Sequence, residues 1–173
     1  MHDYTLIVGD VTNLNLPTYT TPRTILIPHV VNNMGVFNAG VALALKRKWP
    51  KAEKDYHRWL DFWKKHQRKI LGQIFASLVE CTEQTTIIVV HMFAQNGVRN
   101  PKNSHPLDYA SLQSCMEAIP EIGQALDRPF SIHCPKFGAG LSGGSWSEIE
   151  KLIRTIWCEK DIPVTVYSYR VER

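Results

Sequence analysis

The sequence predicts an α/β fold, with a mixed, mostly parallel central sheet of about six strands between two layers of helices. Short apolar runs alternate with segments that carry apolar residues at helical spacing. The chain has 173 residues, of which 44% are hydrophobic, and this suits one well-filled domain over residues 1–173. Two glycine-bearing loops follow apolar runs, as in folds that bind ligands beyond the carboxyl ends of parallel strands.

Ten elements are expected in order along the chain. Six runs rich in Ile, Val, Leu, Thr and aromatic residues predict strands: Tyr4–Gly9, Thr24–Val31, Gly72–Val79, Thr86–Met92, Phe130–Cys134 and Val164–Tyr169. Four segments between them predict helices: Ala39–Lys48, Pro50–Lys69, Leu107–Leu126 and Ser145–Glu159. Pro50 suits a first helical turn, and Ser145 with Glu148 predicts a capping box.

Composition favours a soluble protein without a membrane span. No run approaches the roughly 20 apolar residues that a spanning helix needs. The first five residues, MHDYT, lack a basic segment followed by an apolar run. We therefore expect a cytoplasmic monomer. The four cysteines are far apart without a CxxC pair, which predicts reduced core thiols: Cys81, Cys115, Cys134 and Cys158.

The positive charge is concentrated in residues 46–69. This segment holds ten of the twenty Lys and Arg residues and three of the sixteen acidic residues. Such a cluster can attract phosphate or nucleic acid, and it can equally be the solvated face of a helix. Contact with nucleic acid is therefore an open possibility.

The two glycine-bearing loops, residues 32–40 (NNMGVFNAG) and 137–146 (FGAGLSGGSW), are candidate anion sites. In the order strand, glycine-bearing loop, helix, backbone N–H groups point at a bound anion. Alternatively, glycine only supplies positive φ in a turn. The second loop matches GxGxxG, but the single remaining strand and the lack of a Walker lysine argue against an NAD dehydrogenase and an ATPase.

Several single side chains near these loops have two interpretations. Asp10 follows the first predicted strand, where its carboxylate can accept a hydrogen bond from adenine or serve as a turn residue. His29 and His91 lie near strand ends and are either proton donors or core-edge histidines. His133 is expected to be structural. Phe37 can pack against a ligand ring or belong to the core.

Together these segments resemble the macrodomain family. Residues 9–12 (GDVT) resemble its GDIT element, residues 32–40 its distal-ribose loop and residues 138–141 its diphosphate loop. The likeness covers nearly the whole chain. The patterns AGxAxxxK at 39–46 and GxGLxGxxW at 138–146 resemble DNA ADP-ribose glycohydrolase antitoxins and terminal ADP-ribose protein glycohydrolases. Residues 106–112 resemble small phage and bacterial ADP-ribose-1''-phosphate processing proteins.

The resemblance implies a three-layer α/β/α macrodomain that binds ADP-ribose without a metal or cofactor. Asp10 and Val11 would meet adenine, Asn32 the distal ribose, and residues 138–141 the diphosphate. Lys46 would be catalytic, with His29 and Asn32 as further candidates, although Lys46 also suits a helix edge. The expected ligand contacts are Asp10, Val11, Asn32, Asn33, Gly35, Val36, Asn38, Ala39, Gly40, Phe137, Gly138, Ala139, Gly140, Leu141 and Ser142.

Two departures from the family pattern shape the expected activity. Ser142 stands where the protein glycohydrolases carry Asp, so Lys46 lacks a neighbouring carboxylate for acid–base work. Asn38 replaces a common Gly, although Asn tolerates left-handed backbone. We therefore expect a hydrolase that removes a C1'' substituent from ADP-ribose, most simply phosphate. Alternatives are release of ADP-ribose from DNA or protein, and a reader that binds ADP-ribose without turnover.

Overall fold

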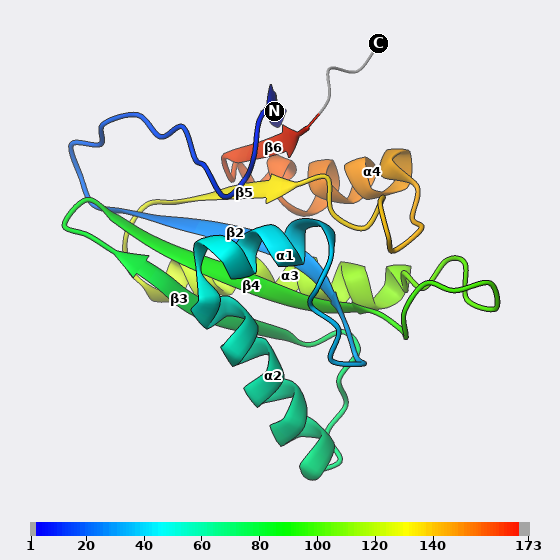
Figure 1. Cartoon of the computed structure of the whole chain (residues 1–173). Coiled ribbons are helices and arrows are strands. Elements are labelled where there is room, and N and C mark those ends of the chain that lie inside the picture. The colour runs from blue at the N-terminus through cyan, green and yellow to red at the C-terminus, as the bar shows by residue number, and fades with distance from the viewer. Residues whose placement is uncertain (1–2, 170–173) are drawn as a thin grey trace.

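A computed structural model describes residues 3–169 and shows one six-stranded sheet with helices on both faces (Figure 1). All ten predicted elements are present. The strands are β1 (Thr5–Val8), β2 (Arg23–Asn32), β3 (Ile74–Cys81), β4 (Thr85–Gln95), β5 (Phe130–Pro135) and β6 (Val164–Ser168). The helices are α1 (Gly40–Lys48), α2 (Pro50–Lys65), α3 (Tyr109–Ala125), α4 (Trp146–Ile156) and the short 3₁₀ helix η1 (Cys158–Lys160).

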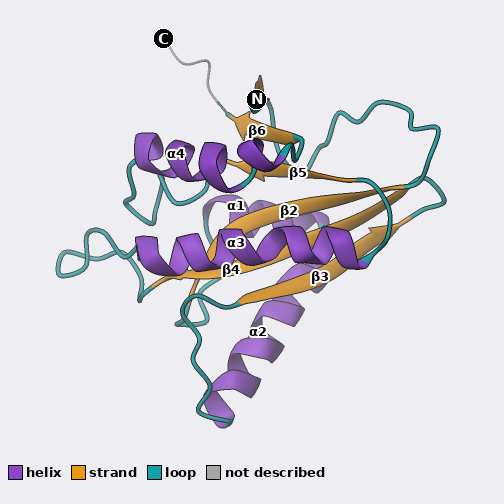
Figure 2. Ribbon diagram, turned by 180° about the vertical axis from the view of Figure 1, so that it is seen from behind, coloured by secondary structure: helices purple, strands orange, loops and turns teal. Residues whose placement is uncertain are grey.

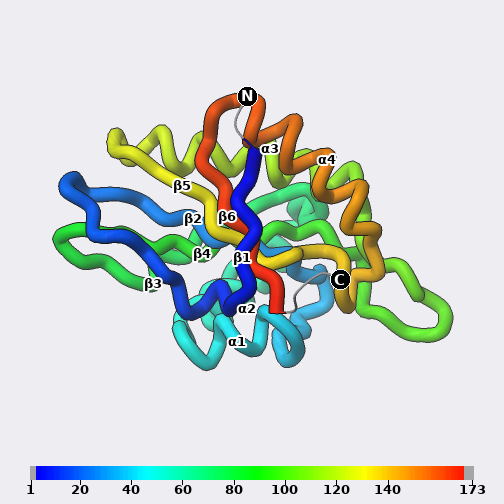
Figure 3. The backbone as a smooth tube through the Cα atoms, turned by 90° about the horizontal axis from the view of Figure 1, so that it is seen from above, coloured from blue at the N-terminus to red at the C-terminus, as the bar shows by residue number. Residues whose placement is uncertain are grey.

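The strand order is β1-β6-β5-β2-β4-β3, and β3 is the only antiparallel member of this sheet. The prediction of a mixed, mostly parallel sheet is therefore confirmed. Figure 3 shows β1 lying beside β6 at one side of the sheet. Because the other five strands run in one direction, their carboxyl ends share one edge of the sheet, where loops converge.

Helices α1 and α2 cover one face of the sheet, and α3 and α4 cover the other (Figures 1 and 2). Under α3 and α4, Met92 of β4 packs in one cluster with Leu112 and Ile149. On the opposite face, Ile27 of β2 packs with Leu45 of α1. Strands β2 and β4 are covered on both sides, which explains their nearly continuous apolar sequence.

Three expectations about local structure are wrong. Ser145 precedes α4, but its hydroxyl lies 2.9 Å from Ser147 Oγ and makes no cap bond, so the capping box does not form. Helix α2 ends at Lys65 and not at Lys69, because Gln67 adopts left-handed backbone with φ of 50°. Cys81 is exposed on the edge strand β3, whereas the other three cysteines are buried thiols.

The sequence predicted the start of α2 correctly. Pro50 occupies the first turn of this helix, where the fixed φ of proline is favourable.

No helix within residues 3–169 is both long and apolar enough to cross a membrane.

Candidate functional site

A cleft of about 770 Å³ opens where the parallel strands end. Its walls come from the carboxyl ends of β2, β4, β5 and β6 and from the loops that follow them. Most of the expected ligand contacts line it, together with His29: Asn32, Val36 and residues 38–40 and 137–142. The structure therefore brings residues of both glycine-bearing loops into the lining of one cleft.

Five of the expected site residues do not line this cleft. Asn33, Gly35 and Lys46 lie outside it, as do Asp10 and Val11. Val11 is buried in the core, with 2% of its surface exposed. Contact of these residues with a ligand stays a prediction.

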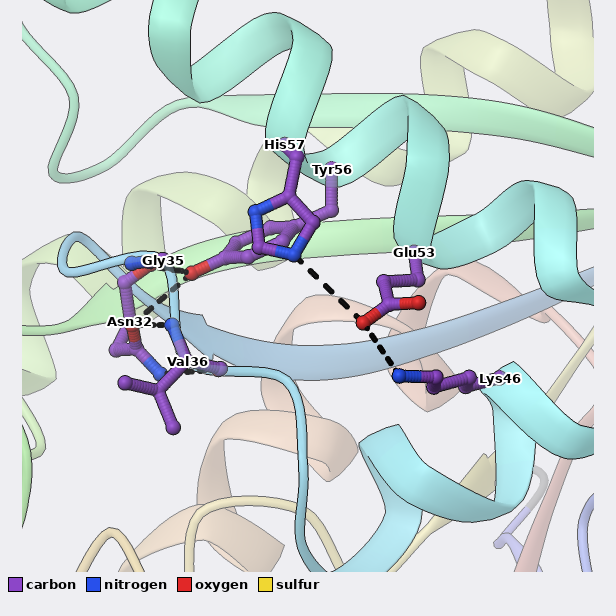
Figure 4. Close-up of polar contacts among 7 residues, drawn as sticks. All are labelled: Asn32, Gly35, Val36, Lys46, Glu53, Tyr56 and His57. Carbon is purple, nitrogen blue, oxygen red and sulfur yellow. Dashed lines mark hydrogen bonds and ion pairs between the residues drawn. The ribbon is translucent and has the colours of Figure 1, made fainter.

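Asn32 organises the first loop from inside (Figure 4). Its Oδ1 accepts hydrogen bonds from the N–H groups of Met34 at 2.9 Å and Val36 at 3.2 Å, and its Nδ2 donates to Val36 O at 2.7 Å. The buried hydroxyl of Tyr56, on α2, donates to the Asn32 backbone oxygen at 2.8 Å and accepts from Gly35 N–H at 3.1 Å. The Asn32 side chain thus shapes the loop with its Oδ1 and with one of the two N–H groups of its Nδ2.

The second loop leaves a run of backbone donors unpaired. None of the N–H groups of Gly138, Gly140, Leu141 and Ser142 hydrogen-bonds to another described residue. Gly138 and Ser142 are buried, where backbone N–H groups normally have a partner, whereas Gly140 and Leu141 are exposed. A run of N–H donors that the protein leaves open to a ligand is typical of an anion site. Gly140 faces open space, because a Cβ built there meets nothing within 4 Å.

Close packing fixes the shape of this second loop. A Cβ on Gly144 would lie 2.6 Å from Gly138 O, and Gly138 itself has φ of 76°. The hydroxyl of buried Ser142 donates to Gln95 Oε1 at 2.6 Å, which ties the loop to the end of β4. Ser142 therefore has a structural partner at the position where the resemblance expected an acid.

The loop between β4 and α3 is joined to the first loop through Asn33. Asn33 Oδ1 accepts from Gly97 N–H at 2.8 Å, and Asn33 Nδ2 donates to Asn96 Oδ1 at 3.1 Å. Three loops from three neighbouring strands are thus linked by direct hydrogen bonds. Such cross-links hold a binding site in one geometry before the ligand arrives.

His29 belongs to a buried polar chain across three strands. Its Nε2 lies 2.8 Å from His91 Nδ1, and His91 Nε2 lies 3.0 Å from Ser77 Oγ. Burial lowers the pKa of His91 to about 3 and also lowers that of His29. Both rings are therefore neutral at physiological pH, each able to donate one hydrogen bond and accept another.

His133 is structural, as expected. Its ring lies 3.2 Å from Ser131 Oγ and 3.0 Å from Tyr167 Oη. Burial, with a smaller contribution from Arg23, lowers its pKa to about 4. Phe37 is likewise a core residue, with 1% of its surface exposed and its ring packed edge-on against His29.

Lys46 lies at the junction of α1 and α2 (Figure 4). Its ammonium is 2.8 Å from a carboxylate oxygen of Glu53, which also lies 3.7 Å from His57 Nε2. The expectation that Lys46 has no neighbouring carboxylate is therefore wrong, because α2 brings Glu53 beside it. The lysine is 39% exposed, so this ion pair contributes little to stability. Its catalytic role stays a prediction.

Asp10 closes the first turn after β1. Its Oδ1 accepts hydrogen bonds from the N–H and the hydroxyl of Thr12, both at 2.8 Å. Tyr169, which lines the cleft, lies close to this carboxylate: burial first, and then the charge of Asp10, raise the pKa of Tyr169. Asp10 thus flanks the β6 end of the cleft.

Sequence reasoning missed a second group of cleft residues. They follow β4, β5 and β6 in places without glycine patterns: Gln95, Val98, Arg99, Lys136, Tyr167, Ser168 and Tyr169. The expectation that ligands bind beyond strand ends could have found them. For the residues after β4 this expectation was not enough, because the sequence predicted the end of that strand at Met92, whereas the strand ends at Gln95.

The charge of the lining favours an anion. Arg99 and Lys136 both line the cleft, and no Asp or Glu is among its lining residues within the described part of the chain. Lys136 lies over the ring of Trp146, 5.2 Å from its centroid. Cations and unpaired N–H groups without a competing carboxylate suit phosphate groups.

Comparison with known proteins identifies the fold family. No protein-family model matches the chain. A solved structure of a macrodomain protein from Streptomyces coelicolor is 27% identical, has a TM-score of 0.73, and aligns over 97% of this chain and 100% of its own. The chain has the macrodomain fold. The alignment covers nearly all of this chain, so it includes the sheet and its helices.

Two further relatives of this macrodomain are informative. A structure of Thermosipho africanus DarTG in complex with ADP-ribose has a TM-score of 0.65 at 22% identity, over 96% of this chain and 42% of that one. A Candida albicans protein named ADP-ribose 1''-phosphate phosphatase is 21% identical over 144 residues, which are 81% of this chain and 88% of that protein.

Proposed function

We propose that this macrodomain binds ADP-ribose in the cleft and hydrolyses ADP-ribose-1''-phosphate to ADP-ribose and inorganic phosphate. The main support is that the unpaired N–H groups belong to residues that line the cleft, Gly138, Gly140, Leu141 and Ser142, together with two cationic side chains. The phosphatase name of the Candida albicans relative and the ADP-ribose in the DarTG structure point in the same direction.

The proposed ligand spans the carboxyl ends of four strands. Its diphosphate would receive N–H groups from the second loop, next to β5. Its distal ribose would face the loop at residues 32–40, and its adenine would lie toward Tyr169 and Asp10 at the end of β6. In this arrangement the adenine amine can donate to the Asp10 carboxylate, as the sequence suggested.

Hydrolysis in this cleft would depend mainly on positioning and charge. Water would attack phosphorus, the bond from phosphorus to the C1'' oxygen would break, and that oxygen would leave as the hydroxyl of ADP-ribose. Fixed cations and N–H groups stabilise charge on the transferred phosphoryl group without reorganising. His29, which lines the cleft, and Asn32 and Lys46 stay candidates for a direct role.

A second candidate function is a reader that binds ADP-ribose without turnover. It is favoured by the engagement of the polar groups: Asn32 is bonded within its loop, Ser142 to Gln95 and Lys46 to Glu53. A general acid or base needs to reach the reacting atoms, and these groups already have partners. Turnover separates the two candidates.

The test is release of phosphate from ADP-ribose-1''-phosphate by the purified protein. We expect multiple turnovers by the wild type and none by Gly140→Glu, which places a carboxylate in the open cleft without a backbone clash. The variant controls for contaminating phosphatases. Binding of ADP-ribose without phosphate release would contradict the phosphatase and support the reader.

A further inference from the structure

Arg99 is an exposed cation in the wall of the cleft, on the loop between β4 and α3. Within residues 3–169 it forms no ion pair. The lining residues include no Asp or Glu that would compete for it. Its guanidinium is therefore free to offer its N–H donors, in a planar fork, to a ligand in the cleft.

Hydrogen bonds hold the base of this loop in place. Gly97, two residues before Arg99, donates its N–H to Asn33 Oδ1 at 2.8 Å. Farther along, Asn103 Nδ2 donates to the backbone oxygen of Asn96 at 3.0 Å, which closes the loop on itself. Because Asn33 belongs to the first loop, the backbone that carries Arg99 is tied to that loop.

The order of the strands gives the cleft a direction. Strands β6, β5, β2 and β4 are adjacent in this order, so the cleft runs from Tyr169 at one end to Arg99 at the other. A ligand with its diphosphate at the β5 loop and its distal ribose at the β2 loop points the substituent on C1'' toward the β4 loop. Arg99 is the cation at that end.

We propose that Arg99 recognises the phosphate on C1'' and so makes the site prefer ADP-ribose-1''-phosphate over ADP-ribose. This inference rests on the proposed function. A phosphate monoester carries up to two negative charges and binds arginine through two parallel N–H···O bonds. ADP-ribose has only a hydroxyl at this position, so it gains far less from the contact.

The test compares Arg99→Gln with Lys102→Gln. Both changes remove one positive charge from the same loop, but Lys102 does not line the cleft. Calorimetry would measure the Kd of ADP-ribose and of a non-hydrolysable phosphonate analogue of ADP-ribose-1''-phosphate. We expect Arg99→Gln to weaken binding of the phosphonate about tenfold more than binding of ADP-ribose, the scale of one hydrogen-bonded charge.

Three results would overturn the assignment. The first is that Arg99→Gln weakens the binding of both ligands by the same factor. The second is that Lys102→Gln weakens binding of the phosphonate as much as Arg99→Gln does, which would indicate only long-range charge. The third is an unchanged preference in both variants. If the wild type binds neither ligand, the proposed function fails together with the assignment of Arg99. If the wild type binds both ligands and Arg99→Gln changes nothing, only the assignment of Arg99 fails.

Discussion

At the scale of single residues, the contact between Tyr56 and Asn32 determines the shape of the first loop. The Tyr56 side chain is fully buried, stacks on Phe93, and its hydroxyl bonds both Asn32 and Gly35. Burial raises the pKa of Tyr56, so the hydroxyl keeps its proton over the whole physiological range. Phenylalanine would keep the packing and remove only these hydrogen bonds.

We therefore predict that Tyr56→Phe loses about 1–3 kcal/mol of unfolding free energy and weakens ADP-ribose binding about fivefold or more, because a buried hydrogen-bond network is left unpaired. Urea unfolding and calorimetry would measure the two effects. The matched control is Tyr4→Phe, whose hydroxyl bonds Glu150 away from the cleft. Unchanged affinity in Tyr56→Phe, or an equal loss in Tyr4→Phe, would contradict this role.

This contact also marks the limit of residue-level prediction. The pattern around Asn32 indicated a binding loop, and the structure places that loop at the cleft. Its partner Tyr56 is 24 residues away on a helix, and their contact depends on how α2 docks. A one-dimensional pattern carries no information on docking, so the same limit applies to the bonds between Asn33 and Gly97 and between Ser142 and Gln95.

At the scale of elements, hydrophobic periodicity was sufficient to predict all six strands and all four α-helices. Their ends were predicted less well, because a few residues decide them. Helix α2 ends at Lys65, two residues before the left-handed Gln67. Strand β4 continues past Met92 through three further buried residues, Phe93, Ala94 and Gln95. That extension carries β4 to the cleft and explains why Arg99 was missed.

Helix α3 packs closely on the start of β5 through Gly123. A Cβ on Gly123 would lie 2.3–2.6 Å from the ring of Phe130. Alanine favours helices by up to about 1 kcal/mol over glycine. Overpacking a well-filled contact costs about 1–3 kcal/mol, and we expect it to outweigh this gain.

We predict that Gly123→Ala lowers the unfolding free energy by about 1–2 kcal/mol, the net of overpacking and helix propensity. Denaturant unfolding would measure it. The neighbouring exposed residue gives the control, since Gln124→Ala raises helix propensity without meeting β5. A Gly123→Ala variant as stable as the wild type would show that α3 can move away from the sheet without loss.

At the scale of the whole molecule, the parallel order of β6, β5, β2 and β4 assembles the cleft from segments far apart in the sequence. Sequence patterns identified the two glycine-bearing loops, and the topology adds the cationic loop after β4. The central claim is that this assembled cleft binds ADP-ribose, with the N–H groups of the second loop facing its diphosphate.

Calorimetric titration of ADP-ribose into the wild type, Gly140→Ala and Gly140→Glu tests this claim most directly. A Cβ at Gly140 meets nothing within 4 Å and its φ lies outside the left-handed region, so both variants should fold normally. We predict binding by the wild type and by Gly140→Ala, and none by Gly140→Glu, whose carboxylate would repel the diphosphate. No binding by the wild type, or equal binding by all three proteins, would contradict the account.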